Sequence, residues 1–178
     1  MLKATCRPHA HLKIQTCKLS FKPCVDRGLQ ILTTPLAQES SDEPMDTGSK
    51  PEVLDEIFGD LVDLSETTEH WNKNVGIFAS NPETMILRAS KLRQKIRDRS
   101  EKEIVLVSHG VFLHAMAGNY STDGEQLTRQ WENTECRSYT FNDDEEATLV
   151  ETEESIQNRP DLKYHPPQEK VKDSPMEE

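Results

Sequence analysis

The sequence lacks several features by which common classes of protein are recognised. No apolar run approaches the roughly 18 residues that a membrane-spanning helix needs, so we expect a soluble protein with no membrane partner. No stripe of lysine and arginine is present to face the phosphates of nucleic acid, so a nucleic-acid partner is not expected. There is no nucleotide-binding fingerprint and no histidine and carboxylate cluster with ligand spacing. We therefore expect no cofactor and no metal.

Cysteine is scarce, with four residues at positions 6, 17, 24 and 136. Without a dense cysteine framework a reducing compartment is expected, and we place the protein in the cytoplasm. Cys6, His9, His11 and Cys17 have the side chains of zinc ligands, but their spacing fits no usual zinc pattern. Residues 1–30 carry six basic side chains against one acidic side chain, which leaves an organelle presequence as an alternative.

Basic residues are also few towards the C-terminus. The net charge is −11, and residues 143–178 hold twelve acidic and four basic side chains. A chain of 178 residues with 34% hydrophobic content supports one domain. We expect that domain over residues 1–151, followed by a disordered acidic tail over residues 152–178.

The first part of the domain is expected to form a strand over 29–33, a long polar loop over 35–50 and a helix over 51–62. Asn81-Pro82-Glu83 is a strong helix start, because asparagine caps, proline fits the first turn and glutamate complements the helix dipole. The helix should run for about four turns with one apolar stripe. Its basic residues are expected mainly on the opposite, solvated face: Arg88, Lys91, Arg93, Lys95 and Arg97.

After this helix we expect a strand over 103–108 and two further helices, over 111–117 and 124–132. Residues 137–142 alternate like a strand, and 147–151 could pair with them across the turn-like DDEE. Helices and strands in this order predict an α/β fold with helices packed on a sheet.

His109 lies between the apolar run IVLVS and Gly110. An isolated histidine on such a run is usually a packed residue bonded to a neighbouring carbonyl. Here, however, the order strand, histidine, glycine, helix places it where ligands collect in open α/β sheets. The following helix start offers unpaired N–H groups, which favour a phosphate. His114, on the helix, is expected to pack or to lie at the rim.

The stretch VLVSHGVFLHAM resembles the second histidine motif of the histidine phosphatase superfamily, which has the phosphoglycerate-mutase-like fold, in its fungal-type branch. Three other stretches agree in order: LAQESSDEPMDTGS resembles the loop with the acidic residue, HWNKNVGIF its tryptophan-centred segment, and WENTECRSYTF its late strand. IQTCKLSF resembles the family's early helix, so the resemblance covers about residues 14–150.

The resemblance implies a three-layer sandwich with a central, mostly parallel sheet. It also implies phosphomonoester hydrolysis or phosphoryl transfer through a phosphohistidine, on a small phosphorylated substrate. By resemblance Glu39 is the proton donor, and His109 and Gly110 hold the phosphate. Where the family has a phosphate-binding arginine, this sequence has His11 or, with a shift of one residue, Leu12. The general acid would need a raised pKa, and phosphoryl transfer needs positioning and charge compensation.

The Arg-His-Gly motif that supplies the family's nucleophile is absent from these residues. His9 is a poor substitute, because residues 2–6 are too polar for a buried parallel strand. We therefore expect an incomplete sheet without its first strand, and an N-terminally truncated, inactive member of the family. Two alternatives stay open: an active phosphatase whose true start lies upstream, and a non-catalytic interaction protein on the same scaffold. The sequence decides neither the substrate nor the oligomeric state.

Overall fold

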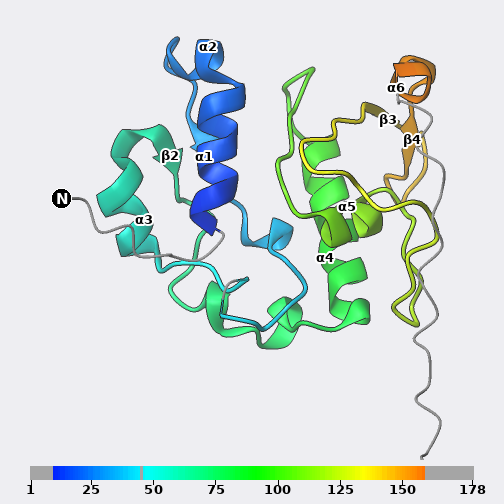
Figure 1. The fold of residues 1–178 in the computed structure, drawn as a ribbon, viewed down its shortest axis with the longest axis horizontal. Helices are drawn as coiled ribbons and strands as arrows, with labels where there is room; N and C mark the ends of the chain where they lie inside the picture. The colour runs from blue at the N-terminus through cyan, green and yellow to red at the C-terminus, as the bar shows by residue number, and fades with distance from the viewer. Residues whose placement is uncertain (1–9, 45, 159–178) are drawn as a thin grey trace, which may run out of the picture.

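The computed structural model describes residues 10–44 and 46–158, and these residues form a mixed structure of helices and short strands. The first half of the chain lies on one side of the molecule and α4, α5 and the C-terminal hairpin lie on the other (Figure 1). The predicted α/β composition is therefore confirmed at this coarse level. The described residues contain two sheets, each of two strands, so the expected single central sheet is not seen there.

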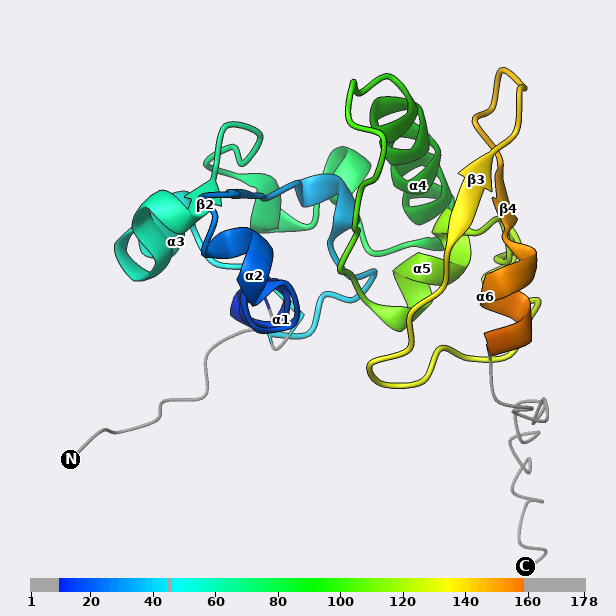
Figure 2. The ribbon, with the colours of Figure 1, turned by 90° about the horizontal axis from the view of Figure 1, so that it is seen from above.

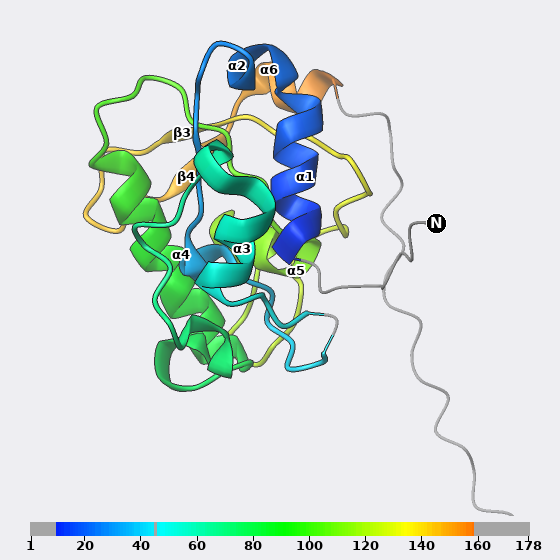
Figure 3. The same cartoon turned by 90° about the vertical axis from the view of Figure 1, so that its left-hand side faces the viewer.

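The first half is built from α1 (Ala10–Ser20), α2 (Lys22–Val25), β1 (Ile31–Leu32), α3 (Pro51–Phe58) and β2 (Val62–Asp63). The two strands are parallel, with Ile31 opposite Val62. A small core of Ile14, Leu54 and Val62 joins α1, α3 and β2, and Figure 3 shows α1 and α3 side by side. The predicted helix over 51–62 ends early as an α-helix because Gly59 adopts a φ of 47°.

In the described part of the chain, four short 3₁₀ helices connect the larger elements, and all four lie between β1 and α4. Their bounds are Pro35–Ala37, Gly59–Leu61, Trp71–Lys73 and Gly76–Phe78. The long polar loop predicted over 35–50 is confirmed apart from its first short turn.

The second half contains the main core, between α4 (Pro82–Arg97) and α5 (Gly110–Met116). The side-chain oxygen of Asn81 accepts a hydrogen bond from the N–H of Thr84, so the predicted helix start is confirmed. The buried side chains between the two helices are Met85, Ala89, Leu92, Phe112, Ala115 and Met116.

The chain closes with an antiparallel pair, β3 (Tyr139–Phe141) and β4 (Leu149–Glu151), followed by α6 (Glu153–Asn158). The pair was predicted, and Figure 2 shows it standing beside α4 and α5. The expected disorder from residue 152 is wrong for α6. There the hydroxyl of Ser155 accepts from the N–H of Ser138 and donates to Glu151, which ties the helix to the hairpin. The rest of the predicted tail, 159–178, lies outside the described residues.

Two predicted elements are not formed. Residues 103–108 are not a strand, since they make no backbone hydrogen bond with another described residue. Residues 124–132 are irregular and not helical: Gly124 has a φ of 88°, and Tyr120 pairs with Gln126 in an isolated bridge. Among the described residues, no helix is both long and apolar enough to span a membrane.

Candidate functional site

His109 stands where an extended segment becomes a helix. Its backbone is extended, with φ −105° and ψ 149°, and α5 begins at the next residue, Gly110. The carbonyl of His109 accepts the first helical hydrogen bond, from the N–H of Leu113 at 2.9 Å. The predicted junction of histidine, glycine and helix is therefore confirmed, although the segment before it is not paired as a strand.

The side chain of Glu39, which belongs to the first half of the chain, lies next to His109. Its Oε2 lies 3.3 Å from Nδ1 of His109, and the two side chains are 15% and 13% exposed. The other carboxyl oxygen, Oε1, accepts a hydrogen bond of 2.9 Å from the N–H of Ser40. The structure thus brings together the two residues that the family resemblance singled out.

Arg88 of α4 holds the segment that carries Glu39. It is fully buried, at 0% exposed, and its guanidinium donates hydrogen bonds to the carbonyls of Leu36, Gln38 and Glu39. The guanidinium also lies 5.3 Å from the ring centre of Phe112. From the α5 side, the hydroxyl of Ser108 donates to the carbonyl of Ala37 at 2.7 Å.

The prediction of a solvated basic face on α4 is wrong for Arg88, which is buried, and for Arg93, which is half-buried, whereas Arg97 is exposed as expected. Besides Arg88, Arg93 donates to the last carbonyls of α5, and Arg97 donates to the carbonyl of Asp144. A guanidinium carries several donors on a long stem, so it can bind backbone carbonyls that the apolar stripe does not cover. Lys91 of the same helix is exposed, as expected.

The environment of Glu39 favours its protonated form. Burial raises the pKa of this carboxyl, and the negative charge of Asp46 acts in the same direction. The Ser40 N–H and the charges of Lys13 and Arg88 oppose this change without cancelling it. Burial also lowers the pKa of Arg88 to about 10, although the negative charge of Glu39 acts to raise it. A carboxyl with a raised pKa can donate a proton nearer to neutral pH.

A cavity of about 180 Å³ adjoins Glu39. Three parts of the chain line it: Glu39 itself; Gly110, Val111 and His114 of α5; and Gln126, Gln130 and Trp131 of the irregular segment. Gly110 leaves room here, since a Cβ added to it would meet only Trp131, at an ordinary contact distance of 3.7 Å. A carboxyl, an imidazole, two amides and an indole can each form hydrogen bonds with a small ligand.

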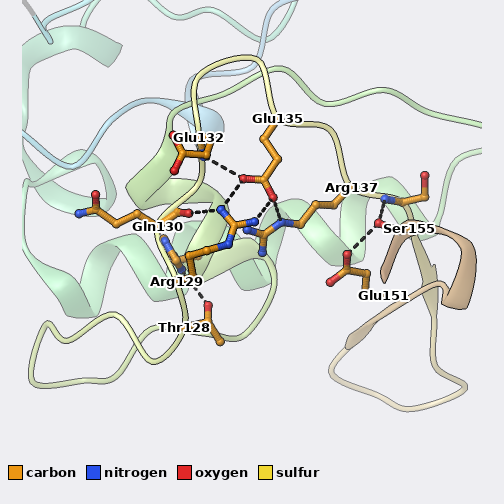
Figure 4. Close-up of polar contacts among 10 residues, drawn as sticks. Thr128, Arg129, Gln130, Glu132, Glu135, Arg137, Glu151 and Ser155 are labelled. Atoms are coloured by element: carbon orange, nitrogen blue, oxygen red, sulfur yellow. Dashed lines mark hydrogen bonds and ion pairs between the residues drawn. The ribbon is translucent and has the colours of Figure 1, made fainter. Parts of the chain in front are cut away.

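One wall of this cavity is fixed by Arg129, Glu135 and Arg137, which we call the arginine clasp (Figure 4). Arg129 donates to both oxygens of Glu135, at 2.9 and 2.6 Å, and Arg137 donates to one of them at 2.7 Å. The guanidinium of Arg137 also lies 3.9 Å from the ring centre of Trp131. The clasp therefore positions the indole that lines the cavity.

Burial tends to raise the pKa of Glu135, but its hydrogen bonds to Arg129 and Arg137 and to the N–H of Glu132 outweigh it, and the pKa is about 2. The carboxylate therefore stays charged between the two arginines. Sequence reasoning missed the clasp, since part of this segment was expected to be helical. The signal was present as two arginines that flank WENTEC.

The tryptophan-centred segment secures the far end of the 35–50 loop. The indole N–H of Trp71 donates to the carbonyl of Ser49, and the side-chain amide of Asn72 donates to the carbonyl of Gly48. The ring of Trp71 covers Gly48 so closely that an added Cβ would lie 1.8 Å from it. Only glycine fits at position 48 beneath this ring.

His11 does not line the cavity. Its Nε2 lies 3.0 Å from the hydroxyl of Ser49, and its ring packs edge-on against Phe58, 5.6 Å away. The structure thus brings His109, Gly110 and Glu39 together and leaves His11 with the 35–50 loop. His9 lies outside the described residues. Within the described part of the chain, no cluster of three metal-ligating side chains is found.

No family model, curated protein or solved structure matches the chain. The resemblance to the histidine phosphatase superfamily therefore depends on the sequence motifs alone.

Proposed function

We propose that the protein binds a phosphomonoester with a site of the histidine phosphatase type, in which Glu39 and His109 act on the phosphoryl group. The observation that carries the proposal is the contact between these two side chains, which are 70 positions apart in the chain and 3.3 Å apart in space. His109 binds phosphate oxygens by hydrogen bonds, and protonated Glu39 donates to the ester oxygen.

The residues around this pair support an anionic ligand. The positive charges of Arg88 and Lys13 act on Glu39, which places both within electrostatic reach of the site. The two terminal nitrogens of Arg88 donate to the carbonyls of Leu36, Gln38 and Glu39, so its role is to position Glu39 and to add positive charge. Gly110 lets the ligand approach the backbone closely.

Turnover by these 178 residues is expected to be negligible. Hydrolysis through a phosphohistidine needs an imidazole that attacks phosphorus in line with the leaving oxygen. The family's Arg-His-Gly motif, which supplies that imidazole, does not occur in the sequence. A carboxyl and one phosphate-binding histidine can hold an ester but lack a group that accepts phosphorus.

The proposal includes the sandwich architecture that the resemblance implies. The parallel pairing of β1 with β2 supports it, because the family's sheet is mostly parallel. The apolar segment 104–107 and the extended backbone of His109 also support it, since they lead into α5 as a sheet strand leads into a ligand-binding loop.

Calorimetric titration with inorganic phosphate tests the proposal. Replacing His109 by alanine removes a charge-assisted hydrogen bond, and we expect phosphate affinity to fall about tenfold or more. His70→Ala is the matched control, because the His70 side chain is exposed and lies outside the cavity. Equal phosphate affinity in the wild type and in the His109→Ala variant would falsify the proposal.

A further inference from the structure

One end of the molecule carries two surfaces of opposite charge. The first, which we call the basic tip, consists of the last turn of α1, α2 and the turn that follows, over residues 18–27. The second is α6, Glu153–Asn158. Figures 1 and 3 show α2 and α6 at the same end of the molecule, and Figure 2 looks down on that end and shows them well separated. The two surfaces are therefore different parts of one face.

The basic tip stands out in an acidic protein. The net charge of the chain is −11, yet residues 18–27 contain three basic residues, Lys18, Lys22 and Arg27, and one acidic residue, Asp26. All four are exposed. Lys22 pairs with Asp26 at 2.7 Å, whereas Lys18 and Arg27 form no ion pair with another described residue. Two positive charges of the tip are therefore available to a partner.

The surface of α6 has the opposite charge. Glu153 and Glu154 are exposed and form no ion pair within the part of the chain that the structure describes. Residues 143–158 contain seven acidic residues and no basic residue, so no cation of this segment neutralises them. Each surface also exposes one large apolar side chain, since Leu19 is 75% exposed and Ile156 is 50% exposed. The two surfaces are thus complementary in charge and alike in apolar content.

The presence of both charges on one face limits the kind of partner. An anionic membrane or a nucleic acid that met the basic tip would also meet α6, whose carboxylates repel it. The partner must present an acidic surface to the tip and a basic surface to α6, at the same separation. A second copy of the chain does so by symmetry, because two copies that meet at this end about a two-fold axis place the tip of each against α6 of the other.

We propose that this end of the molecule is the interface of a homodimer, in which Lys18 and Arg27 of each copy pair with Glu153 and Glu154 of the other. The exposed apolar side chains of the two surfaces pack together between these pairs. The contact occurs twice, so the assembly is closed and stops at two copies. Exposed ion pairs are individually weak and the net charges of the copies repel, so we expect a dissociation constant in the micromolar to millimolar range. The inference does not depend on the proposed phosphate site.

Sedimentation equilibrium of the full chain at about 0.15 M salt tests the proposal. The Debye length is then about 8 Å, so the repulsion between distant acidic groups is largely screened. We expect the wild type to change from monomer to dimer with increasing concentration and to form no larger species. A chain that stays monomeric up to about 1 mM would overturn the proposal. Growth beyond the dimer would overturn the two-fold arrangement.

Charge reversal separates a specific contact from general repulsion. The tip variant combines Lys18→Glu with Arg27→Glu, and the α6 variant combines Glu153→Lys with Glu154→Lys. Each should raise the dissociation constant about tenfold or more, because both ion pairs of each contact become repulsive. General repulsion predicts the opposite result for the α6 variant, whose net charge is nearer to zero than that of the wild type.

A mixture of the two variants is the most specific test. When a tip variant meets an α6 variant, both contacts again join opposite charges. We therefore expect the mixture to form dimers with a dissociation constant within about threefold of the wild-type value. Asp55→Lys combined with Glu56→Lys is the matched control, since it changes the net charge as the α6 variant does, at exposed positions of α3 outside both surfaces. The control should dimerise at least as well as the wild type.

A second measurement uses the wild type alone, because lysine in the first turn of α6 opposes the helix dipole and could unfold this short helix. In ¹⁵N NMR spectra recorded on dilution, the amide resonances of residues 18–27 and 153–157 should shift, and those of α3 should stay in place. If both reversal variants associate as the wild type does, or if dilution moves neither set of resonances, the interface is not at this end and the inference is wrong.

Discussion

Arg88 connects the core of the protein to the candidate site. Its guanidinium has no exposed surface and binds three carbonyls of the segment that ends in Glu39. The sequence predicted the apolar stripe of α4 correctly, but it could not show that a charged side chain would fill the space beside Phe112. Such a side chain is identified only when the carbonyls that it must satisfy are known.

Replacing Arg88 by methionine is expected to lower the free energy of unfolding by about 3 kcal/mol or more. The substitution keeps much of the buried volume but leaves several buried carbonyls without donors, each at a cost on the order of 1–3 kcal/mol. Urea denaturation measures the effect. Lys91→Met, on the exposed face of the same helix, should change the free energy of unfolding by less than about 0.5 kcal/mol. Unfolding of both variants at the same urea concentration would contradict this role for Arg88.

Glu39 and His109 could be predicted from the sequence only through the family motifs. The junction of apolar run, histidine and glycine is a local signal, and the structure bears it out. Glu39 has no local signal of its own, since a carboxylate in a polar loop is ordinarily solvated. Its position follows from contacts with Arg88 and His109, which are distant in the sequence.

The segment 124–137 shows how a local pattern can mislead about a whole element. Residues 124–132 resemble a short helix in composition, yet the chain is irregular there and turns at Gly124. What orders the segment is the arginine clasp and the contact of Arg137 with Trp131. These are interactions between charged and aromatic side chains, and the periodicity of apolar residues does not predict them. By contrast, α4 and the pair β3–β4 carry their signals locally, in a capping residue and in alternation across a turn.

The clasp should make stability dependent on acid pH. Glu135 has a pKa of about 2 in the folded protein, below its ordinary value of 4.5. A depressed pKa stabilises the fold above the unfolded value, and that stability is lost as the pH falls through 4.5 towards 2. At 1.36 kcal/mol per pH unit, the contribution is about 3 kcal/mol.

Denaturation of the wild type and of Glu135→Gln between pH 7 and pH 3 measures this contribution. The variant should be the less stable at pH 7, and the gap in unfolding free energy should narrow as the pH falls, because only the wild type loses a charge at position 135. The other carboxyl groups contribute equally to both proteins, so their contribution cancels in the difference in unfolding free energy between the wild type and the variant. A gap that stays constant over this range would show that the clasp is not a charged cluster.

Across the molecule, the two halves meet where residues 35–39 pack between α4 and the start of α5 (Figures 1 and 2). The predicted class of helices and strands is confirmed, but the predicted single sheet requires pairing that the described residues do not show. Residues 103–108 have the apolar and β-branched composition that favours a strand. A strand also needs a neighbour, and no property of an isolated segment reveals whether one is present.

Amide hydrogen exchange tests this description of the whole chain. Residues 104–107 make no backbone hydrogen bond with another described residue, and Val105 is 58% exposed. Their amides should therefore exchange much faster than those of α4, whose buried face lies in the main core. Protection of 104–107 equal to that of α4 would mean that the segment pairs with another part of the chain or with a second molecule.

The central claim is that Glu39 and His109 hold a phosphomonoester without cleaving it, and ³¹P NMR of the purified chain mixed with glycerol 3-phosphate tests it most directly. The account predicts that the ester resonance broadens or shifts with the wild type, that His109→Ala reduces this change, and that no inorganic phosphate accumulates. An inorganic phosphate signal that grows steadily with the wild type and disappears in the His109→Ala variant would contradict the account.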